Sequence, residues 1–171
     1  MNNTVKFGAL VERCALKPKT AQYVLRTSGA LSGMPKAGRQ GSHREFSLRQ
    51  AVQLAICTHL VEGGITLTNS AKIVRFCESE ATKHRRTNRS EQRIYASKTL
   101  DPWFLIVDNG RYCKLWREQL RHDNNLIDED DYLNIVTGKR HAASPLRLTR
   151  YQVNVTELEY RLWAWIGRTI P

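Results

Sequence analysis

The first 78 residues alternate between apolar stretches with helical spacing and short polar turns. The first stretch has apolar side chains at i, i+3, i+4 and i+7, namely Phe7, Leu10, Val11 and Cys14. Pro18 suits the first turn of a second helix, where its missing N–H has no helical partner, and Gly29 is placed to end that helix. The expected inward face of this helix consists of Ala21, Val24 and Leu25. The spacing predicts two short helices joined by a tight turn.

Residues 32–46 interrupt this periodicity with three glycines and one proline, which predicts a loop or a β-wing. Ser47 and Gln50 then have the spacing of a capping box, which opens a third helix that ends at Gly63-Gly64. One face of that helix is expected to hold Leu48, Val52, Ala55, Ile56, His59 and Leu60. Thr66 or Thr68 can cap a fourth helix, with an apolar side made of Leu67, Ala71, Val74 and Cys77.

The chain changes character after a charged stretch at residues 79–93, in which Ala81 is the only apolar residue. We expect this stretch to be a basic linker, or the frayed end of a helix, between a module at residues 1–78 and a second at 94–171. In the second module, apolar runs at residues 103–108 and 111–116 flank Asn109-Gly110. Both residues tolerate positive φ, so the pattern predicts a β-hairpin.

Three more elements are predicted after the hairpin. Asp128 is placed to cap a short helix that runs across Tyr132, Leu133 and Val136 and ends at Gly138. Period-2 stretches within residues 146–155 predict one or two strands. Thr156 and Glu159 have capping-box spacing and open a C-terminal helix, whose apolar face would hold Leu158, Leu162, Trp165 and Ile166. The predicted class is α+β: an N-terminal helical winged helix-turn-helix followed by a small α+β domain with a β-hairpin and a C-terminal helix.

Charge is distributed unevenly between the two modules. The chain has a net charge of +11, and residues 1–93 carry 16 Lys/Arg against 6 Asp/Glu, whereas residues 94–171 carry 11 against 10. A basic module joined to a near-neutral one is typical of a nucleic-acid-binding protein. The sequence has neither an apolar window long enough to span a membrane nor the pattern of a secretory signal, so we expect no membrane partner.

The second predicted helix supplies the candidate DNA contacts. In a helix-turn-helix this helix lies in the major groove, so its outward side chains must donate, accept or carry positive charge. The outward positions are Lys17, Lys19, Thr20, Gln22, Tyr23 and Arg26. Arg and Lys pair with guanine or phosphate, Gln pairs with adenine, and a Tyr can donate to phosphate or lie against a sugar. On the wing, the candidates for backbone or minor-groove contacts are Lys36, Arg39, His43 and Arg44.

Residues 7–77 resemble the DNA-binding domain of MerR-type transcription regulators. That family has a segment like V-S-P-x-T-L-R-Y-Y, and residues 16–24 match it at Pro18, Thr20 and Tyr23. Gln22 stands where the family has Arg, and Val24 replaces its second Tyr. The end of the family wing, G-Y-R-x-Y-S, corresponds to residues 42–47, and the following helix pair to residues 47–54 and 63–67. The resemblance implies a winged helix-turn-helix that binds double-stranded DNA and regulates transcription.

Two departures limit what the resemblance implies. Members of that family continue into a long dimerisation helix, but this chain has no sustained heptads. Metal-sensing members carry cysteines at the effector end, whereas beyond Cys77 this chain has only Cys113. We therefore expect neither a metal sensor nor the promoter-twisting mechanism of the family. Residues 94–171 are expected to dimerise, sense an effector or hold a partner protein.

Several residues have a structural and a chemical interpretation. Cys14, Cys57, Cys77 and Cys113 fit no metal-ligand spacing, so we interpret them as buried core thiols in a reducing cytosol, with a redox or metal role as the alternative. The four tryptophans, Trp103, Trp116, Trp163 and Trp165, are expected in the core or at a dimer interface rather than in a ligand cage. The acidic run at residues 128–131 is expected to be a solvated helix start rather than a metal site.

The sequence thus predicts a sequence-specific, dimeric DNA-binding regulator without a cofactor and without enzymatic activity, in the cytoplasm of a bacterium or encoded by a phage. Three alternatives stay open. An excisionase-like or architectural DNA-binding factor would share the first module. A DNA-modifying enzyme, such as a nuclease, would use Asp101, Asp108, Lys114 and Glu118 near the hairpin. RNA is a weaker candidate ligand, since no aromatic platform or GXXG loop is evident.

Overall fold

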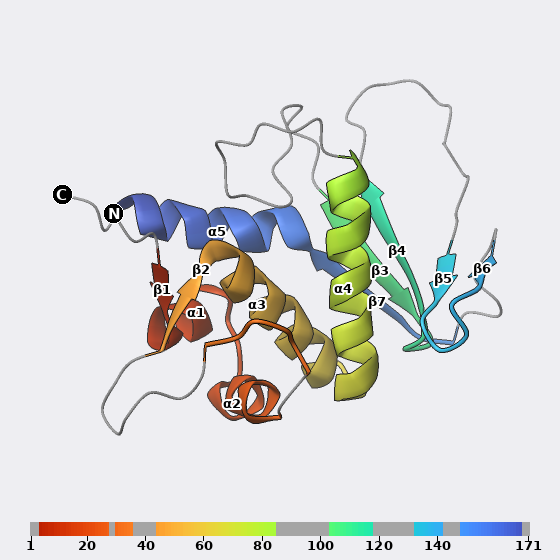
Figure 1. The fold of residues 1–171 in the computed structure, drawn as a ribbon, viewed down its shortest axis with the longest axis horizontal. Helices are drawn as coiled ribbons and strands as arrows, with labels where there is room; N and C mark the ends of the chain where they lie inside the picture. Colours follow the sequence, from red (N-terminus) through yellow and green to blue (C-terminus); the bar gives the residue numbers. More distant parts are fainter. Residues whose placement is uncertain are drawn as a thin grey trace.

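The computed structural model describes residues 4–27, 30–35, 44–84, 103–117, 132–141 and 148–168. Within these residues the chain forms five helices and seven strands, with the strands in one two-stranded and one five-stranded sheet (Figure 1). The predicted α+β class is therefore confirmed. In the same residues, no helix combines the length and hydrophobicity needed to cross a membrane.

The N-terminal half contains six elements. In chain order they are β1 (Thr4–Lys6), α1 (Phe7–Arg13), α2 (Pro18–Arg26), β2 (Glu45–Ser47), α3 (Leu48–Glu62) and α4 (Leu67–His84). The predicted order of four helices is confirmed. Strand β1 was not predicted, because three residues are too short to show a period. It pairs antiparallel with β2 and places Val5 opposite Phe46, and both side chains are fully buried.

Helix α3 is the central element of the fold. Its capping box is present: Gln50 N–H donates to Ser47 Oγ at 3.3 Å, and Ser47 N–H donates to Gln50 Oε1 at 2.8 Å. The predicted single apolar face is wrong, however, because Gln53, Leu54 and Thr58 are also buried. Helices α2, α4 and α5 (Val155–Arg168) each pack against α3, so it is surrounded by protein on most sides.

Helix α4 extends into the charged stretch at residues 79–93. Residues 79–84 belong to the helix, so for them the interpretation as a helix end is confirmed and the interpretation as a linker is wrong. Ala81 is buried on it, and Glu80 accepts from Arg140 of the sheet at 3.0 Å. Contacts made by this last turn explain why a segment poor in apolar residues stays helical. Residues 85–93 of the predicted linker lie outside the described residues.

The second half is built on an antiparallel sheet with strand order β6-β5-β4-β3-β7. The strands are β3 (Trp103–Asp108), β4 (Tyr112–Arg117), β5 (Tyr132–Asn134), β6 (Arg140–His141) and β7 (Arg150–Asn154). The predicted hairpin is confirmed, with Asp108 paired to Tyr112 across the turn. Asn109 and Gly110 both have positive φ, 52° and 66°. Residues 150–154 confirm a strand within the predicted stretch.

Two local predictions for the second half are wrong. Residues 132–134 form strand β5 instead of a helix, because Tyr112 and Cys113 of β4 pair with Asn134 and Leu133 and so extend the sheet. The acidic run before it lies outside the described residues. Helix α5 is present, but its cap is Asn154, whose Oδ1 accepts from Glu157 N–H at 2.9 Å. Thr156 instead accepts from Trp103 N–H at 2.9 Å, which ties the helix start to β3.

The two halves share one hydrophobic core. Helix α5 returns across the molecule and packs on α3, α1 and β1, while α4 packs on β4 (Figure 1). Leu10 and Leu54 of the first half belong to the same buried cluster as Leu105 and Leu162 of the second. Apolar side chains from before and after the predicted linker therefore bury one another in this core.

Gly63, at the end of α3, lies where the first half meets β7. A Cβ at this position would lie 2.4 Å from Cε1 of Tyr151, so only glycine fits without displacing that ring. We expect Gly63→Ala to lower the free energy of unfolding by about 1–3 kcal/mol through overpacking, measured by urea unfolding. In a Tyr151→Ala background the same substitution should cost much less. Equal costs in the two backgrounds would show that Tyr151 is not the constraint.

Candidate nucleic-acid interface

Helix α2 displays the residues that the sequence predicted to be outward. Lys17 at the N-cap and four residues of the helix itself are exposed, namely Lys19, Gln22, Tyr23 and Arg26, while Thr20 is half-buried. Ala21 and Val24 are buried, as expected for the inward face. Figure 1 shows α2 at the lower border of the molecule, away from α5, and its outward face is exposed among the described residues.

The exposed face has a defined order of side chains. At 100° per residue, Lys19 and Arg26 lie seven positions apart on one line, about 10 Å from each other. Gln22 and Tyr23 lie between them, on either side of that line. Tyr23 is 53% exposed, which is a large exposure for an aromatic side chain. The exposed face of α2 thus has an amide and an aromatic ring between two cationic side chains.

Contacts at both ends hold α2 in place. The carboxylate of Glu62, at the end of α3, accepts from Lys17 N–H at 2.7 Å and satisfies a donor at the start of α2. At the other end, Thr27 Oγ1 donates to the carbonyl of Tyr23 at 3.0 Å. The sequence analysis did not single out Glu62, since a lone carboxylate 45 residues from its partner gives no local signal.

The turn between α1 and α2 requires an unusual backbone conformation. Ala15 has φ of 51°, in the left-handed region that residues other than glycine seldom adopt. Cys14 and Leu16 on either side of it are buried and fix the turn against the core. The turn that sets the angle between α1 and α2 thus includes an unfavourable backbone conformation at Ala15.

The segment predicted to be a loop or a β-wing is described only in part. Lys36, Arg39 and His43 lie outside the described residues. Arg44 is half-buried and directly precedes β2, and its carbonyl accepts from Phe7 N–H at 3.2 Å, which joins residue 44 to the start of α1. Residues 45–47 at the end of the segment form β2, which pairs with β1, so the wing itself stays a prediction.

The segment that contains α2 and the wing is free of acidic residues. Residues 13–44 include seven Lys/Arg and no Asp or Glu. On α2 itself, Lys19 and Arg26 form no ion pair within the described part of the chain. Because no neighbouring carboxylate neutralises them, these cations are available to a polyanion.

The four cysteines are buried and form no disulfide, as predicted. Burial raises the pKa of the Cys14, Cys57 and Cys113 thiols to about 12, and it raises the pKa of Cys77 well above its ordinary value. Such thiols stay protonated at neutral pH, and a protonated thiol is a poor nucleophile and a poor metal ligand. Groups of three or more metal-ligating side chains are also absent from the described residues.

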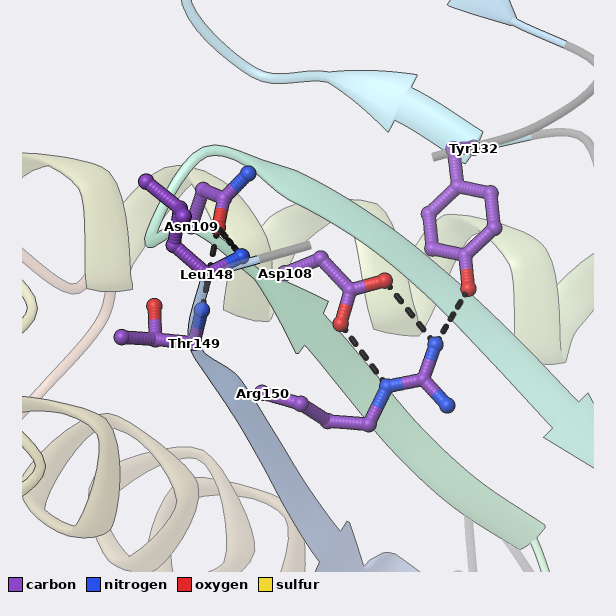
Figure 2. A network of polar contacts seen from close by, with 6 residues as sticks. All are labelled: Asp108, Asn109, Tyr132, Leu148, Thr149 and Arg150. Atoms are coloured by element: carbon purple, nitrogen blue, oxygen red, sulfur yellow. Dashed lines mark hydrogen bonds and ion pairs between the residues drawn. The ribbon is translucent and has the colours of Figure 1, made fainter. Parts of the chain in front are cut away.

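The residues considered for a nuclease are only partly brought together. Asp108 is fully buried, and both of its carboxylate oxygens accept from Arg150, at 2.8 and 2.9 Å (Figure 2). Arg150 also donates to the hydroxyl of Tyr132 at 2.9 Å, and Lys114 lies 4.9 Å from the centre of the Tyr132 ring. This network links four strands of the sheet. Asp101 and Glu118 lie outside the described residues.

The tryptophans do not form one cluster. Trp103 and Trp165 pack against the shared core, whereas Trp163 is 47% exposed on α5. Trp116 lies on β4, but its side chain is outside the described set. The core position predicted for these residues is thus confirmed for Trp103 and Trp165.

Comparisons with known proteins give no relative. No family model matches the chain, and no curated protein or solved structure is significantly similar to it.

Removing the strain at Ala15 should stabilise the protein. We expect Ala15→Gly to raise the free energy of unfolding by up to about 1 kcal/mol, because glycine adopts positive φ without the Cβ penalty. The matched control is Ala9→Gly within α1, which should lower it by at least about 0.5–1 kcal/mol. Thermal unfolding of both variants measures the two effects. A loss of stability in Ala15→Gly comparable to that of the control would contradict the assigned strain.

The buried thiols should make the protein sensitive to alkali. Their folded pKa values lie above the ordinary value of 9.0, so the folded state retains protons that the unfolded state releases, and stability falls as pH rises above about 9. We expect Cys57→Ala to lose stability less steeply between pH 9 and 11, by about 1 kcal/mol per pH unit. Urea unfolding across this range measures the slopes, and parallel curves for the two chains would refute the assignment.

Proposed function

We propose that the chain belongs to the winged helix-turn-helix class of DNA-binding proteins, with α2 as the helix that enters the major groove. The observation that carries this proposal is the exposed face of α2. It presents Lys19, Gln22, Tyr23 and Arg26 to solvent, on a helix anchored from behind by buried apolar side chains. These side chains match the donors, acceptors and cations that a major-groove helix needs.

Within that class, we propose a sequence-specific transcription regulator similar to the MerR type. The sequence pattern at residues 16–24 and the basic residues Lys36, Arg39, His43 and Arg44 of the predicted wing support this assignment. A homodimer would contact two half-sites about one helical turn apart, or a multiple of it. An excisionase-like architectural factor is the alternative, and the two differ in whether the bound DNA has a defined sequence.

Selection from a random duplex DNA library with the full chain tests the proposal. The full chain is the proper probe, because α5 contributes to the core around α3 and a fragment of residues 1–80 would lose that contact. Enrichment of a palindrome supports a dimeric regulator. Strong binding without enrichment, with a steep salt dependence, supports the architectural alternative. No retention of DNA would refute both.

Substitutions on α2 should weaken binding in a charge-dependent manner. We expect Lys19→Ala to lower affinity and, if Lys19 contacts a phosphate, to reduce the slope of log K against log salt by about one unit. Arg161→Ala is the matched control, since Arg161 is half-exposed on α5, a helix that Figure 1 shows away from α2, and its loss removes the same charge. Fluorescence anisotropy over a salt series measures both. Equal behaviour of the two variants would exclude Lys19 from the interface.

A further inference from the structure

One end of the five-stranded sheet forms a compact exposed edge. It consists of the β3–β4 turn at residues 109–111, the β5–β6 turn at residues 135–139, and residues 148–149 before β7, and we call these segments the turn edge. Backbone hydrogen bonds join them. Ile135 N–H donates to the carbonyl of Arg111 at 2.9 Å, and Asn109 N–H donates to the carbonyl of Thr149 at 2.9 Å.

Two asparagine side chains hold the backbone of the turn edge. Asn109 Oδ1 accepts from the N–H groups of Leu148 and Thr149, at 2.9 and 3.1 Å (Figure 2). Asn134 Oδ1 accepts from the N–H groups of Val136 and Thr137, at 2.9 and 3.2 Å. Side-chain bonds of this kind fix the conformation of turns. The turn edge is therefore ordered before any partner binds.

The side chains displayed on this ordered backbone are apolar and cationic. Leu148 is 79% exposed and Val136 is 57% exposed, the largest values among the large apolar side chains described. Arg111 and Lys139 are exposed beside them, and neither forms an ion pair within the described residues. A single exposed apolar residue is common, but two of them on fixed turns beside two unpaired cations are suited to a partner with both charge and apolar surface.

The turn edge is connected to α2 through the α3–α4 turn. On one side of that turn, Glu62 accepts from Lys17 N–H at the start of α2. On the other side, Asn69 Nδ2 donates to the carbonyl of Gly110 at 3.5 Å. Figure 1 shows α2, the α3–α4 turn and the β3–β4 turn along the lower border of the molecule. A long ligand bound at α2 can therefore continue towards the turn edge.

Two carboxylates described near this border, those of Asp108 and Glu62, are already bonded within the protein. Asp108, directly behind the β3–β4 turn, is buried against Arg150. Glu62 is hydrogen bonded to the N-cap of α2. Among the described residues, Lys17, Lys19, Arg111 and Lys139 expose positive charge along this border, which favours an extended polyanion there.

We propose that the turn edge is a second contact on the DNA duplex that α2 binds, an inference that rests on the proposed function. Arg111 and Lys139 lie against phosphates beyond the segment contacted by α2. Leu148 lies against the sugars or the edge of the minor groove, where apolar side chains commonly contact DNA. The second half of the chain accordingly lengthens the DNA site, in addition to any role in joining two copies.

The test compares single variants of the full chain on the duplex enriched by selection, or on a random duplex of about 30 base pairs if none is enriched. Arg111→Ala and Lys139→Ala should each reduce the salt slope by about one unit and weaken binding several-fold, whereas Arg161→Ala should change neither. Leu148→Ala should weaken binding without changing the slope, because it removes no charge. Hydroxyl-radical footprints should retract at the same flank in Arg111→Ala and Lys139→Ala.

The outcomes separate this inference from the proposed function. If Lys19→Ala weakens binding while Arg111→Ala, Lys139→Ala and Leu148→Ala behave like the Arg161→Ala control, the turn edge does not contact DNA and α2 alone does. If the wild-type chain binds no duplex, both proposals are overturned. Weakened binding with an unchanged footprint would also overturn the inference, since the affected contact would then not lie at a flank.

Discussion

The burial of α3 on nearly all sides is the constraint on which the rest of the structure depends. Residues from α2, α4 and α5 pack against it, and Gly63 at its end leaves just enough room for the ring of Tyr151 from β7. In an N-terminal module alone, part of the apolar surface of this helix would be exposed to water, which would lower the stability of the module. The C-terminal helix therefore completes the core of the segment that carries the candidate interface.

In α2, the residues that hold the helix in place are different from those that are exposed to solvent. Apolar residues of α2 pack toward α3, and the Glu62 carboxylate and the Thr27 hydroxyl bond to its two ends. The outward side chains of α2 are therefore not needed to hold the helix in place. The turn edge of the sheet is similar. The side chains of Asn109 and Asn134 accept hydrogen bonds from backbone N–H groups of the turns, while other side chains of the turns are exposed to solvent. Preorganised supports of this kind reduce the entropy lost on binding.

The network of Asp108, Arg150 and Tyr132 connects three strands of the sheet, although none of these strands is long. Arg150 on β7 bonds in a bidentate manner to Asp108 on β3, and its guanidinium also reaches the hydroxyl of Tyr132 on β5. Removing Arg150 would take the bidentate partner from the buried Asp108 carboxylate, which destabilises the fold. The sequence analysis considered Asp108 as part of a possible nuclease site, whereas its bonds to Arg150 show a structural role that the sequence alone could not reveal.

The sequence alone determined the features that depend on neighbouring residues. Periodicity located α1 and α2, the capping box located the start of α3, and Asn109-Gly110 located the hairpin, because each signal comes from residues within one turn or helix. The exposed set on α2 followed from the same spacing. Tertiary structure decided the elements that depend on distant partners. Strand β1 forms by pairing with β2, and the strand at Tyr132 forms by pairing with the edge of β4. Helix α4 continues past Glu80 with contacts that include Arg140. Glu62 at the N-cap of α2 and the turn edge beside it belong to this second group, since only packing brings such separated residues together.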